Sequence, residues 1–134
     1  MTRTRGIVWT GVQTDRFDEM DRFLTAILDA EPAVRDDGFR LWGLPNGDLV
    51  ELFAPGHHDD FGSGPVVGFQ VADLAAATNA VTAAGGEVVG GYGPNADGYQ
   101  SIHVRAPDGN VYEMVHDPDH ERRLSAPGEP AEAG

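Results

Sequence analysis

Hydrophobic and polar positions along the chain follow one order that occurs twice. In the first copy, a short apolar run over residues 7–13 precedes a stretch, 17–28, whose apolar residues recur at helical spacing. This pattern predicts a strand followed by an amphipathic helix. A short strand near Val34 and two strands over residues 39–44 and 49–53 complete a β-α-β-β-β unit.

The second copy has the same predicted order. Its elements are a strand over 65–71, a helix over 73–84 that ends at two glycines, and strands over 87–89, 99–105 and 110–116. Two such repeats, spanning about 7–53 and 66–115, predict an α+β protein of two tandem β-α-β-β-β modules. We expect residues 1–117 to form a single domain, with a linker or rim loop over 54–64. The polar residues 118–134 predict a disordered tail.

The last hairpin of each repeat carries one acid, at the same number of residues after its turn. Pro45-Asn46-Gly47 leads to Glu51, and Pro107-Asp108-Gly109 leads to Glu113. Because side chains alternate along a strand, matching acids lie on matching faces. We therefore expect Glu51 and Glu113 to face one cleft between the repeats.

The length of the turn decides which neighbours these acids have. Across a two-residue turn, Trp42 lies opposite Glu51 and Arg40 opposite Phe53, all on one face. The same count puts His103 on the face away from Glu113, in a packing role. A turn longer by one residue would bring His103 into the cleft, because a one-residue slip inverts every face.

A buried carboxylate is costly unless it is protonated, hydrogen-bonded, paired or bound to a cation. One interpretation is structural, with both acids half exposed and paired with Arg40 or Arg105. The other is functional, with both acids facing a ligand as metal ligands, a general base or anchors for its cationic or hydroxyl groups.

Composition narrows the classes of partner. The formal net charge is -13 and every basic residue is an arginine, so the chain would repel nucleic acid and anionic membranes. It has no cysteine, hence no disulfide framework and no thiolate site. No signal-peptide or membrane-spanning run is present, and we expect a cytoplasmic protein.

Several aromatic residues could wall the predicted cleft, and one group of histidines and acids resembles a metal cluster. The aromatic candidates are Trp9, Trp42, Phe53, Phe69 and Tyr99, with Trp42 expected beside Glu51. Residues 57–60, His-His-Asp-Asp, lie in a glycine-rich loop with no predicted partner from a distant strand. A solvated acidic rim is the interpretation we favour for this loop.

The sequence resembles the vicinal oxygen chelate superfamily, which includes glyoxalase I, extradiol dioxygenases and bleomycin-resistance-type binding proteins. The resemblance rests on the paired β-α-β-β-β order, the junction over residues 69–74, and residues 106–113, Ala-Pro-Asp-Gly-Asn-Val-Tyr-Glu, which are similar to a family signature. It implies two modules whose sheets curl into an open cup, commonly completed in a homodimer.

Metal-dependent members are expected to take one ligand from the first and last strand of each module. By position these four places fall on Glu51, on Glu113, on Val8 or Thr10, and on Val67. Valine cannot bind a metal and threonine is a weak ligand, so two carboxylates remain, a poor set for zinc, nickel or iron. If a metal is bound, Glu51 and Glu113 are its expected ligands.

The missing ligand pair favours the antibiotic-binding members of the family. We expect no cofactor, and a metal-independent protein that binds and sequesters a small natural-product antibiotic rather than an enzyme. The expected ligand-binding residues share a place near the predicted cleft: Thr10, Arg40, Trp42, Glu51, Phe53, Val67, Phe69, Tyr99 and Glu113. Three alternatives stay open: a metal-dependent lyase, isomerase or dioxygenase, a cofactor-free epimerase or cyclase that uses one Glu as its base, and a structural or partner-binding module.

Overall fold

The computed structural model describes residues 4–62 and 64–125, and the side chains of these up to residue 122. Its first module has five elements, in chain order β1 (Ile7–Gln13), α1 (Phe17–Leu28), β2 (Val34–Asp36), β3 (Phe39–Gly43) and β4 (Leu49–Phe53). The second module repeats the order with β5 (Val66–Gln70), α2 (Leu74–Ala83), β6 (Glu87–Tyr92), β7 (Gln100–Arg105) and β8 (Val111–His116). The predicted α+β class and its two tandem β-α-β-β-β modules are confirmed.

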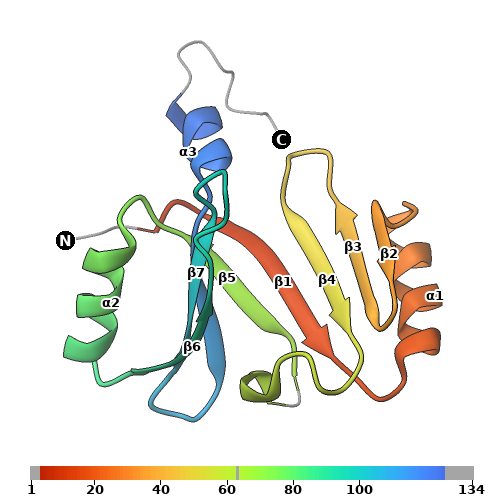
Figure 1. Ribbon diagram of the computed structural model, residues 1–134, viewed down its shortest axis with the longest axis horizontal. Coiled ribbons are helices and arrows are strands. Elements are labelled where there is room, and N and C mark those ends of the chain that lie inside the picture. The colour runs from red at the N-terminus through yellow and green to blue at the C-terminus, as the bar shows by residue number, and fades with distance from the viewer. Residues whose placement is uncertain (1–3, 63, 126–134) are drawn as a thin grey trace.

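All eight strands join one mixed sheet with the order β2-β3-β4-β1-β5-β8-β7-β6. Within each module the first strand pairs parallel with the last, and the two modules meet where β1 pairs antiparallel with β5. The helices α1 and α2 lie on the two outer sides of the molecule, so the sheet curls with its other face turned inward (Figure 1). Sheet and helices thus form an open cup.

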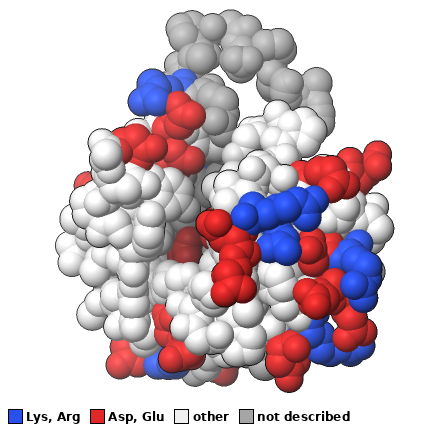
Figure 2. All heavy atoms as spheres, turned by 45° about the vertical axis from the view of Figure 1, so that its right-hand side comes forward, with Lys and Arg blue, Asp and Glu red and all other residues white. Residues whose placement is uncertain are grey.

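The first module buries an apolar face on its helix side. In the first module Trp42, Val50 and Leu52 are buried beneath α1, whose Met20 and Leu24 pack against them. Alternation along β4 then turns its other residues into the cup. The space-filling view in Figure 2 shows a hollow between the two halves.

Both final hairpins have three-residue loops, one residue longer than the predicted turns. Leu44 and Asp48 close the first loop, and Ala106 and Asn110 close the second, each pair through a backbone hydrogen bond. Proline at the first loop position and a glycine with φ near +90° at the third suit a type I turn followed by a left-handed residue. The predicted register was therefore wrong by one residue in both hairpins.

The shift by one residue exchanges the faces of β3 and β7. The partner of Glu51 across the ladder is Leu41, not Trp42, and the partner of Phe53 is Phe39, not Arg40. In the second module His103 lies directly opposite Glu113, on the same face. The packing role predicted for His103 on the face away from Glu113 is corrected by this pairing.

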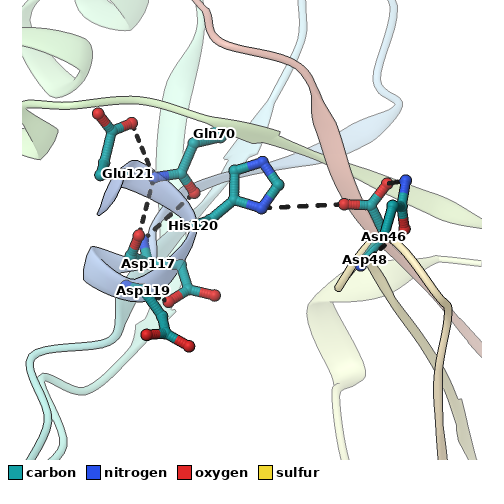
Figure 3. A network of polar contacts seen from close by, with 7 residues as sticks. All are labelled: Asn46, Asp48, Gln70, Asp117, Asp119, His120 and Glu121. Carbon is teal, nitrogen blue, oxygen red and sulfur yellow. Dashed lines mark hydrogen bonds and ion pairs between the residues drawn. The ribbon is translucent and has the colours of Figure 1, made fainter. Parts of the chain in front are cut away.

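Residues 118–134 were predicted to be disordered, but part of them forms a helix, α3 (Pro118–Ser125). The amide of the fully buried Gln70 on β5 donates hydrogen bonds to the carbonyl of Asp117 and to Glu121, at 3.1 and 3.0 Å. On its other side α3 brings His120 to 3.9 Å from Asp48 of the first module (Figure 3). The polar helix is thus held by polar contacts to both modules. Residues 126–134 of the predicted tail lie outside the described residues.

The linker over residues 54–64 also contains structure. A 3-10 turn, η1 (Asp59–Phe61), follows β4 and passes between the two halves of the sheet (Figure 1). Phe61 is buried within the cup and contacts the rings of Trp9 and Phe53 edge to face. Within the described residues, no helix is both long and apolar enough to cross a membrane.

Candidate functional site

The cup holds a cleft of about 340 Å³ between the two modules. Its walls are mainly aromatic, with two acids, two histidines and a few small polar groups among them. The lining residues are Trp9, Phe39, Leu49, Glu51, Phe53, His58, Tyr92, Asn95, Tyr99, Ser101, His103 and Glu113. Every strand of the cup except β2 and β5 contributes to this wall, together with the loops that follow β4 and β6.

Trp9 forms the floor of the cleft. Its indole ring lies over Gly11, where an added Cβ atom would come within 2.4 Å of the ring carbons. A Cβ atom added at Gly68 would lie 3.1 Å from the Cβ of Trp9. The ring therefore needs glycine at position 11, and any larger residue at position 68 would crowd it. Its Nε1–H donates a 3.0 Å hydrogen bond to Glu51, which ties the floor to β4.

Glu51 is largely withdrawn from water. Burial raises the pKa of this carboxyl to about 7, the Trp9 hydrogen bond opposes the rise, and the charge of Glu113 adds to it. A carboxyl with such a pKa changes its protonation state near neutral pH. It can therefore accept a proton from a ligand or donate one to it.

On the opposite wall, His103 stands between two acids. Its Nδ1 lies 2.5 Å from Oδ2 of Asp60, and its Nε2 lies 3.0 Å from Oε2 of Glu113. Burial alone would lower the pKa of His103, but hydrogen bonds and charge from Glu113 and Asp60 outweigh burial and raise it. For the Glu113 carboxyl, burial has the opposite sign and raises the pKa, while the hydrogen bond and charge of His103 oppose the rise. The three side chains form one hydrogen-bonded row.

Local backbone features bring Asp60 to this row. A Cβ atom on Gly90 would lie 2.7 Å from the Asp60 carboxylate and 3.1 Å from Nδ1 of His103, so only glycine leaves room for their contact. The ladder between β6 and β7 shifts register beside Gly90. At the other end of the loop, Gln13 accepts hydrogen bonds from the backbone N–H groups of His57 and His58.

The structure brings some of the predicted site residues together and separates others. Four of the nine line the cleft: Glu51, Phe53, Tyr99 and Glu113. Trp42 does not lie beside Glu51, since it is 0% exposed beneath α1. Arg40 is on that same outer face, where it pairs with Asp21. The one-residue register error explains both misplacements.

The remaining three predicted residues also lie outside this cleft. Thr10 bonds to the carbonyl of Val66, and Phe69 stacks on Tyr112 on the α2 side of the sheet. Val67 lines a different cavity, of about 320 Å³. In β1 and β5 the residues facing the cup are the alternate ones, Trp9, Gly11 and Gly68.

Sequence reasoning missed His58 and His103 as cleft residues, and it missed the contact of Asp60 with His103. The loop over residues 57–60 was interpreted as a solvated rim without a distant partner, and β7 supplies that partner in His103. The signal in the sequence was the proline before each Asn-Gly or Asp-Gly pair, which favours a three-residue loop and turns His103 inward.

Two β-α-β-β-β modules whose strands curl around one cleft define the class of fold to which this protein belongs. A sequence model of the Glyoxalase/Bleomycin resistance protein/Dioxygenase superfamily matches residues 6–114, and the chain belongs to this superfamily. The prediction from sequence is thereby confirmed. No curated protein sequence matches the chain.

Solved structures with the same fold have diverse names. A Mn(II)-bound glyoxalase from Novosphingobium aromaticivorans is 19% identical with a TM-score of 0.66, over 87% of this chain and 40% of that one. A superfamily member from Vibrio splendidus 12B01 is 20% identical with a TM-score of 0.61, over 87% and 100%. Methylmalonyl-CoA epimerase from Streptomyces coelicolor is 18% identical with a TM-score of 0.60, over 86% and 96%. At these identities the likeness concerns the fold alone.

The metal set that the fold family implies does not fit this cup. Of the four strand positions, only Glu51 and Glu113 offer ligand atoms. The residues that face the cup on the first strands are Trp9, whose indole N–H is a donor only, and glycines without side chains. Two carboxyls without a nitrogen ligand make a poor transition-metal site at the floor.

The raised pKa of Glu51 predicts a loss of stability with rising pH. Below pH 4.5 the carboxyl is protonated in both states, and between 4.5 and about 7 only the unfolded state ionises, so folding weakens as pH rises. The shift corresponds to about 3 kcal/mol. Glu51→Gln cannot ionise and keeps an oxygen for Trp9, so its free energy of unfolding should gain about 3 kcal/mol relative to the wild type between pH 4.5 and pH 8.

Urea denaturation at several pH values measures this gain. Glu19→Gln, on the exposed side of α1, is the matched control and should follow the wild-type pH dependence. Parallel pH profiles for Glu51→Gln and the wild type would contradict the assignment of a neutral carboxyl at the cleft floor.

Proposed function

We propose that this protein binds and encloses a small natural-product antibiotic in the cleft, with no metal ion at the four strand positions. The single observation that carries the proposal is the floor of the cup, where the first strands present Trp9 and glycines, none of which offers a metal ligand atom. A volume of about 340 Å³ with aromatic walls lies within the range of small-molecule sites.

The lining indicates which ligand chemistry would fit. Trp9, Phe39, Phe53 and Tyr99 offer flat apolar surfaces on which an aromatic group can stack. Glu51 can anchor an amine or a hydroxyl group between these walls. The net charge of -13 would attract a cationic ligand and supports a small molecule over nucleic acid or a membrane surface.

Trp9 gives a direct reading of binding. Titration with natural-product antibiotics that carry aromatic rings and amines, in a buffer with EDTA, should quench its fluorescence, and mass spectrometry should recover the ligand unchanged. Glu51→Gln should weaken an amine-bearing ligand about tenfold above pH 7, because the neutral amide lacks the charge of the ionised carboxyl.

Trp42 supplies the matched control, because the chain has two tryptophans. Its indole N–H is buried without a hydrogen-bond partner among the described residues, so Trp42→Phe removes no bond. The Trp42→Phe variant should keep the quenching and Trp9→Phe should lose it. Quenching that persists in Trp9→Phe would exclude the cleft as the binding site.

A second candidate function follows from the Glu51 carboxyl. A pKa of about 7 suits a general base at physiological pH, and Glu113 faces the same cleft. A cofactor-free epimerase or cyclase would use Glu51 to remove a proton from the α-carbon of a carbonyl compound and return it to the same or the other face. This chemistry needs an acidic C–H in the bound ligand.

Hydrogen exchange tests this second candidate. Small carbonyl compounds with an acidic α-hydrogen are incubated with the protein in D2O and EDTA, and mass spectrometry follows deuterium incorporation. Proton transfer by Glu51 predicts that Glu51→Gln slows incorporation at least a hundredfold, while Glu19→Gln leaves it unchanged. Equal rates in Glu51→Gln and the wild type would rule out Glu51 as the base.

We also propose that the chain forms a homodimer. On the outer side of α1, Phe23 and Ile27 are 53% and 60% exposed, and exposed apolar groups of this kind support an interface between identical subunits. Sedimentation equilibrium should find a dimer that Ile27→Asp dissociates. A wild-type monomer at all concentrations would contradict the proposal.

A further inference from the structure

Beside the cleft floor lies a second group of side chains that the proposed function does not use. His58, Asp60 and His103 each offer one ligand atom, and the three atoms lie within 4.8 Å of one another. They come from the loop after β4 and from β7, so none is at one of the four strand positions of the family. We propose that these three side chains form a binding site for a divalent transition-metal ion such as Zn²⁺.

The donor set matches this class of ion. Two imidazole nitrogens and one carboxylate oxygen suit zinc and its first-row neighbours, whereas magnesium and calcium prefer oxygen ligands alone. The two histidine rings are close, with 5.6 Å between their centroids. Metal bonds of about 2.0–2.2 Å put neighbouring ligand atoms roughly 3 Å apart. Asp60 and His103 therefore separate slightly to admit the ion.

The contact between His103 and Glu113 provides the outer shell that such sites use. A histidine that binds a metal through one ring nitrogen usually donates the other N–H to a carboxylate, which fixes the ring and its tautomer. Here Glu113 lies 3.0 Å from Nε2, and Nδ1 faces Asp60. Glu113 thus acts on the ion only through His103, as a positioning residue.

The surroundings hold the ligands in place before an ion arrives. The His103 side chain is 3% exposed. The ring of His58 stacks on Phe61 at 4.4 Å between centroids, and its backbone N–H bonds to Gln13. Gly90 leaves the space in which Asp60 meets His103. Prepared ligands lower the ordering cost of binding a metal.

The ion would face the cleft, because His58 and His103 both belong to its lining. Three protein ligands leave a coordination position that a ligand or water can take, as in catalytic zinc sites. The site is independent of the proposed antibiotic binding at the aromatic walls, which is measured in EDTA. Either proposal can therefore fail without the other.

Metal titration of the whole chain tests the site. Protein stripped with EDTA is dialysed against Zn²⁺ or Co²⁺, and metal content and the visible Co²⁺ spectrum are measured. We expect one ion per chain, with nitrogen-ligand bands in the Co²⁺ spectrum. His58→Ala and Asp60→Asn should each lower the affinity at least tenfold, and Glu113→Gln should lower it about tenfold through His103.

The loop offers matched controls one residue away. His57→Ala and Asp59→Asn change the same residue types at exposed positions, and both should keep the ion. Glu51→Gln should keep it too, since Glu51 is a ligand only in a site at the four strand positions. Thermal unfolding in EDTA checks that each variant folds, and His58→Gln replaces His58→Ala if the alanine variant does not fold.

Three results would overturn the proposal. The first is less than one ion per wild-type chain after dialysis. The second is an equal loss of affinity in His57→Ala and His58→Ala, which would indicate non-specific binding by the loop. The third is loss of the ion in Glu51→Gln with retention in His58→Ala, which would move the ion to the cleft floor.

Discussion

The packing of one indole ring determines how the two modules can be used. Trp9 lies on the first strand, over Gly11 and against Gly68, and its N–H holds Glu51. Because the ring fills the floor where the modules meet, the cleft of about 340 Å³ lies above it, between the aromatic walls. On the cup face of β1, neither Trp9, whose indole N–H is a donor only, nor Gly11 offers a metal ligand atom.

Polar groups inside an apolar cup must be paired or must lose their charge. The acids on the two walls meet this requirement in different ways. Within the described residues Glu51 has one side-chain hydrogen bond, from Trp9, and burial raises its pKa to about 7, so it is poised between its neutral and charged forms. Glu113 belongs to a row with His103 and Asp60, in which a proton or a cation can be shared. The cleft therefore has one wall that can exchange protons and one that can hold positive charge.

The superfamily fold places a cleft between two modules but leaves its chemistry to individual side chains. The solved structures of similar fold include a metal-bound glyoxalase and an epimerase. At 19% and 18% identity they share the fold of this chain, and the fold is compatible with both binding and catalysis. That choice depends on Trp9, Glu51 and the His103 row.

Much of the architecture could be predicted from the sequence, because strands, helices and turns follow local periodicity and turn chemistry. The repeated modules and the two inward acids were both visible in this way, and Glu51 and Glu113 do line the cleft. The helix α3 was not predicted, since its polar residues gain their place only from contacts with Gln70 and the first module.

The sequence by itself determined the order of the elements and the position of each acid along its strand, since both are local properties of the chain. Tertiary structure decided which residues meet these acids. A single extra residue in each hairpin loop sent Trp42 beneath α1 and turned His103 into the cleft. The pairing of Asp60 with His103 joins a loop to a strand 43 residues away. Such a contact depends on how the sheet curls, and no local pattern specifies it.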